Sequence, residues 1–256
     1  MAYIGQKPTD KPLSASDLED GLITNSKLAQ DIISGETELA VAPADTDEFL
    51  ISDAGVLKRL DASLVGSQDF VKIASTTVSS NVSSVTLTGF DDTVYGSYYL
   101  RINNAKTDIT GTNRGRIMLR VNTSGGVQSG GSDYTYFNYH YYRRWDTDSN
   151  VERTTVQEGD DKIKLHDWSL SADDAQNSDI WFANPTSTSQ VKIFNITTTV
   201  WKHTSTGADG PYTFSPQDTS GIYQSTTALT GLTFLPTADS ASNISAGSFC
   251  LYGLKK

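Results

Sequence analysis

From Phe70 onward, apolar residues recur with the two-residue spacing of β-strands, and turn-forming residues separate the segments. The clearest case is Arg114–Asn122, where Ile117, Leu119 and Val121 form one apolar face. No helical stretch between the segments is long enough for a parallel crossover. The pattern predicts strands at Phe70–Val78, Val82–Phe90, Val94–Asn103, Arg114–Asn122, Tyr134–Trp145, Lys162–Leu170, Asp179–Ala183, Val191–His203, Ile222–Leu235 and Gly247–Leu254.

The last of these segments, Gly247–Leu254, is apolar on both faces, with Phe249 and Leu251 on one side and Tyr252 on the other. A strand of this kind belongs inside a sheet and beneath another layer. We therefore expect the C-terminal residues to be central to a core. Taken together, the segments predict an all-β fold for residues 66–256, an antiparallel, jelly-roll-like β-sandwich.

Residues 1–65 follow a different pattern, because their apolar residues come at spacings of about four or five. Asp20–Leu28 is typical of a repeated turn unit, and Gln30–Gly35 is a degenerate second copy. Neither provides enough apolar surface to fold alone. This segment is predicted to be disordered, or to pack against copies of itself or a larger assembly. Within it, Ser52–Val56 has the composition of a hairpin turn.

The charge is also unevenly distributed. The chain has 256 residues and a net charge of −10, to which residues 1–65 contribute −7 and residues 66–256 only −3. Such acidity argues against nucleic-acid binding, which needs clustered Lys and Arg. The single cysteine, Cys250, excludes an internal disulfide, and no apolar run of 18 residues or signal peptide is present. We expect a chain made in a cytoplasm and not inserted into a membrane.

Catalytic chemistry has little support in the sequence. The histidines His140, His166 and His203 are scattered, and no acid or nucleophile stands at a recognisable spacing from them. His166 and the adjacent Asp167 would point to opposite faces of a strand. A Gly-x-Ser-x-Gly elbow is also missing. The sequence predicts no enzymatic activity, no catalytic residue and no cofactor.

One acidic segment, Asp146–Glu152, resembles the start of a calcium-binding loop because oxygen ligands alternate along it. However, the glycine expected after Asn150 is Val151, and the twelfth position is Gln157 instead of a glutamate. The alternative is a solvated acidic loop, which the mismatches favour. We assign no metal ligand here.

The strand Tyr134–Trp145 is the most informative chemical segment, because aromatic residues occupy both of its faces. We expect the face with Phe137, Tyr139 and Tyr141 to point into the core. The opposite face combines rigid aromatics with hydrogen-bonding groups, as interfaces and sugar-binding platforms do. Packing at the sandwich rim or in a subunit contact is the favoured alternative. The candidate receptor surface comprises Tyr134, Tyr136, His140, Tyr142 and Arg144.

Several segments resemble virion structural proteins of marine bacteriophages. Ala2–Pro8, Asp20–Ala29 and Asp47–Arg59 are similar to the N-terminal regions of tail-fibre and related proteins. Tyr95–Asn104 and Gly247–Lys255 resemble elements of the β-sandwich that these proteins often carry. The match covers most of the chain, although the degenerate second turn unit favours a short appendage over a long fibre.

This resemblance implies a homo-oligomer, specifically a trimer, in which the N-terminal arm is ordered by winding around its copies. The arm would also attach to another virion protein of the tail or capsid. The predicted virion-attachment residues are Tyr3, Ile4, Lys7, Pro8 and Pro12. The predicted oligomer contacts are Leu18, Leu22, Ile23, Leu28, Ile32 and Ile33.

The function that follows is a short trimeric tail fibre of a virion, with the sandwich displayed towards a glycan or protein of the host surface. The alternative is a head or neck decoration protein or capsid fibre, attached through the same arm. A depolymerase would need clustered carboxylates in a groove, and the sequence shows no such cluster.

Overall fold

The computed structural model describes residues 37, 39–41, 43, 44, 46–65, 69–109, 115–144, 149–167, 174–203, 212–237 and 242–256. The chain divides into two units, residues 1–67 and 68–256, and each is described by itself. Among the described residues all strand pairs are antiparallel, and the single helix is a 3₁₀ turn at Ala62–Leu64. None of these residues forms a helix that could cross a membrane.

In the first unit, the described structure is a hairpin of β1 (Glu48–Asp53) and β2 (Val56–Asp61), which confirms the predicted turn. Ala54 and Gly55 join the strands with φ values of +51° and +85°. Positive φ values at both positions let a two-residue turn match the right-handed twist of the flanking strands. Residues 1–36 lie outside the described part of the chain. The predicted virion-attachment residues and oligomer contacts all fall within that segment, so they stay predictions.

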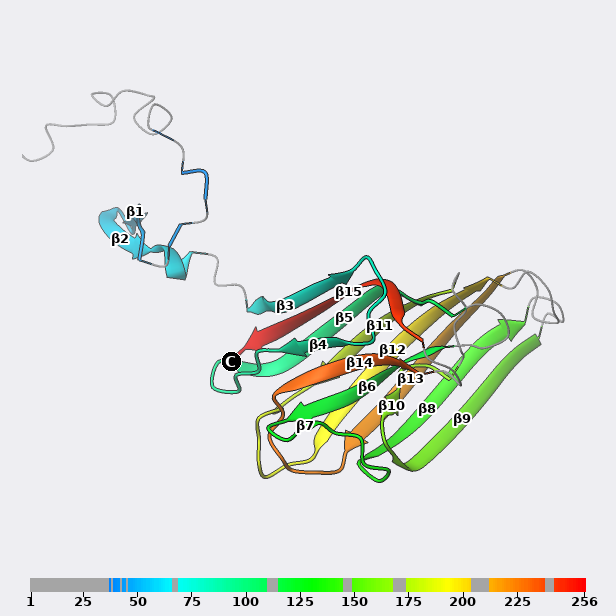
Figure 1. Ribbon diagram of the computed structural model, residues 1–256. Helices are drawn as coiled ribbons and strands as arrows, with labels where there is room; N and C mark the ends of the chain where they lie inside the picture. Colours follow the sequence, from blue (N-terminus) through cyan, green and yellow to red (C-terminus); the bar gives the residue numbers. More distant parts are fainter. Residues whose placement is uncertain are drawn as a thin grey trace, which may run out of the picture. The chain divides into compact units, whose positions relative to one another are not determined.

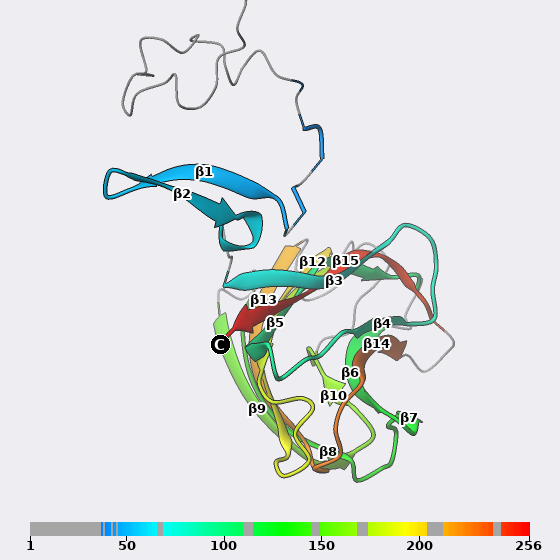
Figure 2. The same cartoon turned by 90° about the vertical axis from the view of Figure 1, so that its left-hand side faces the viewer.

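Two sheets make up the described part of the second unit, and Figure 2 shows the larger one curving around the smaller one. The large sheet has eight strands in the order β3-β15-β5-β11-β12-β13-β8-β9. The small sheet has the order β10-β6-β14-β4, with β7 paired to β6 (Figure 1). The strands are β3 (Phe70–Val78), β4 (Val85–Thr88), β5 (Tyr95–Thr107), β6 (Arg116–Thr123), β7 (Gly126–Val127), β8 (Tyr134–Arg144), β9 (Ser149–Asp160), β10 (Ile163–Lys164), β11 (Ala175–Phe182), β12 (Lys192–His203), β13 (Tyr212–Tyr223), β14 (Gly231–Thr237) and β15 (Ile244–Lys255).

The strand pairing is nested in the manner of a jelly roll. β3 pairs with β15 and β5 with β11 in the large sheet, whereas β4 pairs with β14 and β6 with β10 in the small sheet. Early strands therefore pair with late ones around a central reversal, which confirms the predicted jelly-roll-like sandwich. Two further hairpins, β8–β9 and β12–β13, are inserted into this scheme and widen the large sheet on one side.

The hydrophobic core lies between the two sheets. Alternate residues of β5, including Tyr98, Leu100 and Ile102, point inwards and are fully buried. The small sheet contributes side chains such as Leu119 and Phe234, and the Phe234 ring lies 5.5 Å from that of Phe249 across the core. Each such side chain contributes about 1.5–3 kcal/mol by burial.

The C-terminal strand β15 lies inside the large sheet, between β3 and β5, as predicted. Phe249 and Leu251 are fully buried. The strand also lies beneath another layer, because Phe249 packs against Phe234 of the small sheet. On its other face, Tyr252 is half-buried, and its ring stacks on Phe70 with centroids 5.0 Å apart.

Other predictions are corrected by the sheet pairings. The segment read as an acidic or calcium-binding loop is extended from residue 149 onward, because β9 pairs with β8. The expected strand Ile222–Leu235 is two strands, β13 and β14, separated by residues 224–230. Most of β13 was missed because its inward residues Ser215, Gln217 and Thr219 are polar, so no apolar alternation marks it.

Truncating Phe249 to alanine should lower the free energy of unfolding by about 3–5 kcal/mol, because it leaves a cavity between the sheets. Urea unfolding of the full chain measures the change. The neighbouring Ser248→Ala, on the half-buried face, should change it by about 0.5 kcal/mol or less. Equal urea midpoints for Phe249→Ala and the unmodified chain would show that β15 is not central to the core.

Candidate functional site

The two faces of β8 are the reverse of the predicted ones. Tyr134, Tyr136 and His140 are at most 1% exposed, so the prediction that they form a receptor surface is wrong. Tyr142 and Arg144 also lie in β8, but their side chains are outside the described part of the structure. The face expected in the core, with Phe137, Tyr139 and Tyr141, is exposed instead. Alternation decides which residues share a face, and with aromatics on both faces it cannot decide which face turns inwards.

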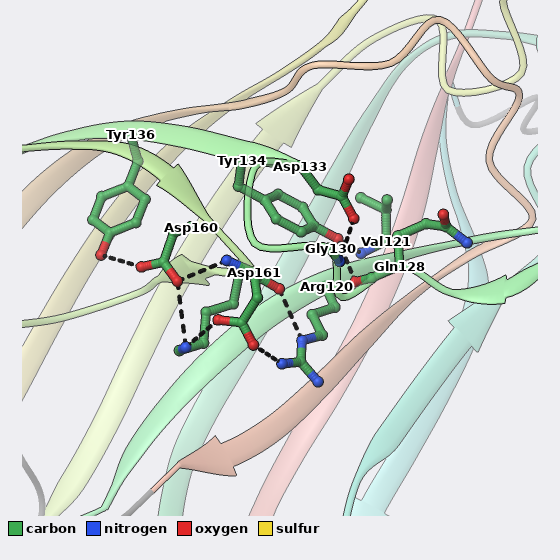
Figure 3. A network of polar contacts seen from close by, with 10 residues as sticks. Arg120, Val121, Gln128, Gly130, Asp133, Tyr134, Tyr136, Asp160 and Asp161 are labelled. Carbon is green, nitrogen blue, oxygen red and sulfur yellow. Dashed lines mark hydrogen bonds and ion pairs between the residues drawn. The ribbon is translucent and has the colours of Figure 1, made fainter.

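The inward tyrosines connect β8 to its neighbours (Figure 3). The Tyr134 hydroxyl accepts a hydrogen bond from the Val121 amide at 2.9 Å and donates one to the Gln128 carbonyl at 3.0 Å. The Tyr136 hydroxyl donates to Asp160 Oδ2 at 3.2 Å. Burial raises the pKa of both phenols well above the ordinary value, so they stay protonated and act as donors. Tyr134 thus fastens the large sheet to the small one, whereas Tyr136 joins the adjacent strands β8 and β9 of the large sheet.

An ion-pair cluster lies close to these tyrosines at the edge of the small sheet, as Figure 3 shows. Arg120 contacts the Asp161 carboxylate and donates from Nε to the Asp161 carbonyl at 2.9 Å. Lys162 bridges Asp161 and Asp160. Partial burial raises the pKa of Asp161, but hydrogen bonds with Lys162 and Asp160, together with the charges of Lys162 and Arg120, outweigh it and lower the pKa to about 2. The arrangement locks the end of β9 against β6.

Three residues far apart in sequence form a buried polar cluster. The Ser215 hydroxyl shares a hydrogen bond with His140 Nε2, and His166 Nε2 donates to the Ser215 carbonyl at 3.2 Å. The two imidazole rings lie edge to face, 4.8 Å apart. The spacing of these residues in the sequence does not indicate the cluster, because they come from β8, β13 and the segment after β10. All three are at most 1% exposed, so the described structure offers no opening to a substrate at Ser215.

Burial lowers the pKa of His140 to about 4. The nearby Asp167 carboxylate opposes this shift and Arg153 adds to it, but the loss of solvation is the larger effect. Asp167 is itself held by Asn138 at 3.0 Å and Thr155 at 3.2 Å. His140 is therefore neutral near pH 7, and the cluster joins the inner faces of β8, β9 and β13.

The outward face of the large sheet has a different character, because large apolar side chains remain exposed across it. The register places seven residues directly opposite one another in a single row across adjacent strands. In strand order from β15 to β9, this cross-strand row consists of Tyr252, Tyr99, Trp181, Asn195, Ser220, Phe137 and Val156. Other exposed aromatics of the same face are Tyr139, Tyr141, Trp201 and Phe214.

Two hollows open on this face, on either side of Asn195. The first has a volume of about 370 Å³ and is bounded by Trp181 and Ile193. The second has a volume of about 270 Å³ and is bounded by Phe137 and Asp218. Asn195 lines both, so the two hollows adjoin. Small polar residues thus form the floor between two aromatic walls.

The polar groups around the hollows differ in whether they already have partners. Asp179 is paired with Arg101 at 2.7 Å and also accepts a hydrogen bond from Tyr99. Asp218 accepts from Thr197 at 2.8 Å. Among the described residues, neither the Asn195 amide nor the Ser220 hydroxyl has a hydrogen-bond partner. These two groups are available to a ligand.

The chemistry that this surface supports is stacking on aromatic rings combined with hydrogen bonding. No group of three or more metal-ligating side chains occurs among the described residues. The sequence signal for this surface was present in Trp181 and in the aromatic strand Tyr134–Trp145. It could not be located without the register of β11, β12, β13 and β8.

Comparison with known proteins adds little to this description. No family model and no curated protein matches the chain. Among solved structures, the CBM2 module of the evolved Dit of Lactobacillus casei BL23 phage J-1 is 11% identical, with 68% of this chain and 70% of that chain covered and a TM-score of 0.20. An infectious bursal disease virus Gt strain structure is 12% identical over 79% of this chain and 45% of that one, with a TM-score of 0.12. Neither alignment carries an argument about function.

The buried His140 predicts that stability falls as the solution becomes acidic. Its folded pKa of about 4 lies below the ordinary value of about 6.5, so the unfolded chain takes up the proton first. The stabilisation is complete above about pH 6.5 and is lost as pH falls towards 4, by up to about 3 kcal/mol. Urea unfolding at a series of pH values measures this.

The control is His140→Gln, which keeps a polar side chain but cannot titrate. Its free energy of unfolding should change less between pH 6.5 and pH 4 than that of the unmodified chain. Parallel curves for the two proteins would mean that protonation of His140 does not destabilise the fold.

Proposed function

We propose that this chain is a structural protein of a bacteriophage virion, a short trimeric tail fibre whose sandwich recognises the host surface. The observation that carries the proposal is the exposed aromatic face of a folded jelly-roll sandwich, joined to a segment that exposes apolar residues of its own. A monomeric soluble protein rarely leaves such surfaces uncovered. The resemblance of the first 65 residues to virion proteins supports the same reading. The proposal assigns no covalent chemistry to the chain.

The β1–β2 hairpin supports the trimeric arm. A two-stranded hairpin is at best marginally stable in water, and three or more strands or a packed face are needed for independent stability. Here Leu50 and Leu57 lie on the same face and are 73% and 66% exposed. Identical hairpins from two further copies would cover these side chains. We propose that the hairpin continues the self-association expected for residues 1–36.

The sandwich would then be presented in three copies on one shaft. Linking several weak binding sites raises the overall affinity for a surface by orders of magnitude without any new contact. A sandwich that binds its receptor only weakly would thus suffice for adsorption. This is the physical reason for combining a self-associating arm with a separate, stable β-domain.

Replacing Leu50 and Leu57 together by serine should shift the chain from trimer towards monomer, because the two exposed apolar side chains that the copies would cover are lost. Analytical ultracentrifugation at micromolar concentration measures the mass. Val94→Ser serves as the control, since it removes an exposed apolar side chain from the sandwich instead of the hairpin. A full-length chain that sediments as a monomer before any substitution would overturn the trimer.

Purified full-length protein should reduce the adsorption of the phage that encodes it, because it occupies the receptor on the host. The fraction of unadsorbed phage after mixing with cells measures this competition. Immunogold labelling of the particle should place the chain on the tail. Unchanged adsorption with labelling on the head would overturn the tail fibre and support the decoration protein.

A further inference from the structure

We propose that the outward face of the large sheet binds a neutral carbohydrate chain, held between Trp181 and Phe137 and hydrogen-bonded to Asn195 and Ser220. This site rests on the proposed function, because it assigns a ligand class to the surface that would meet the host. The four residues occupy directly opposed positions on β11, β12, β13 and β8. They therefore form one continuous row.

The spacing of the row suits a short oligosaccharide. Trp181 and Phe137 are separated by three strand intervals, which is about 14 Å. Both residues are 44% exposed, and the Trp181 ring packs beside that of Tyr99 on the adjacent strand, with centroids 4.7 Å apart. Rigid rings of this kind offer a negative π face to the C–H groups of a sugar. Little conformational entropy is lost at Trp181 on binding, because Tyr99 already packs against its ring.

The floor supplies the hydrogen bonds that sugars require. The Asn195 amide offers two donors and one acceptor, and the Ser220 hydroxyl offers both functions. Neither group has a partner among the described residues. Asp218 lies next to them in the second hollow and uses only one carboxylate oxygen for Thr197. Neighbouring hydroxyls on a sugar ring match this set of donors and acceptors.

The same polar floor argues against a second copy of the chain as the occupant. An apolar contact would bury the Asn195 amide and Ser220 hydroxyl without partners, at a cost for each group. Charge argues against an acidic polysaccharide, because Asp179 and Asp218 lie beside the row and Arg101 is already paired with Asp179. A neutral glycan satisfies the hydrogen bonds and meets no like charge.

The test uses the full-length chain and a panel of soluble oligosaccharides, in which neutral glucans, mannans and galactans are set beside acidic alginates and galacturonans. Isothermal titration calorimetry measures the affinity per site. At least one neutral oligosaccharide should bind, and Trp181→Ala and Phe137→Ala should each weaken that binding about tenfold or more. Asn195→Ala should weaken it severalfold.

Each variant should unfold at nearly the same urea concentration as the unmodified chain, because the replaced side chains are exposed. Val127→Ala is the matched control, since it truncates an exposed apolar side chain in the small sheet. It should leave the affinity unchanged. A loss of affinity in that control equal to the loss in Trp181→Ala would overturn the site.

Three other results would also overturn it: no binding to any neutral oligosaccharide, binding to the acidic ones alone, or a change of oligomeric mass in Trp181→Ala. The adsorption assay separates this site from the proposed function. Competition that persists in Trp181→Ala would leave the tail fibre intact and refute the glycan site. Glycan binding without any competition would retain the site and refute the tail fibre.

Discussion

The fold depends on the position of β15 between β3 and β5, because this pairing brings the last strand of the chain next to the first strand of the sandwich. The other nested pairs, β4 with β14 and β5 with β11, follow from the same reversal of the chain. Their contacts join residues that are far apart in sequence, so the loop-closure cost must be met before the core forms. Phe249 and Leu251 then close the core from the large sheet.

The two inserted hairpins give the inward and outward faces of the large sheet different chemical characters. β8, β9, β12 and β13 extend it beyond the nested pairs. On the inward side of this extension, the hydrogen-bonded cluster around His140, Ser215 and Asp167 takes the place of a purely apolar core. On the outward side, the same strands carry Phe137, Asn195 and Ser220 of the proposed glycan site, and the adjacent strand β11 adds Trp181. One set of strands thus provides both internal fastening and an open binding face.

Much of the fold could be predicted because alternation is a local property. Phe70–Val78 is a strand with the expected bounds, and the hairpin turn at Ala54 and Gly55 is where its composition placed it. The strand β13 was missed because hydrogen bonding, instead of apolar burial, holds its inward side chains. Its polar alternation has no signature that distinguishes it from a loop.

The candidate site was less predictable, and the reason is again physical. The aromatic content of β8 was visible, but the choice between its two faces depends on the small sheet, which lies elsewhere in the sequence. The row through Trp181, Asn195, Ser220 and Phe137 exists only once three strand pairings have a fixed register. The His140–His166 cluster likewise requires tertiary structure, because nothing in the spacing of the two residues indicates contact.

Backbone amide hydrogen exchange on the full-length chain tests the central role of β15 most directly. If β15 closes the sandwich, amides near Phe249 and Leu251 should exchange only through global unfolding. Their free energy of opening should then equal that of the amides in β5 and β11. Exchange of β15 at a clearly lower free energy, with β5 and β11 still protected, would show that the sandwich stands without its last strand and would contradict the account.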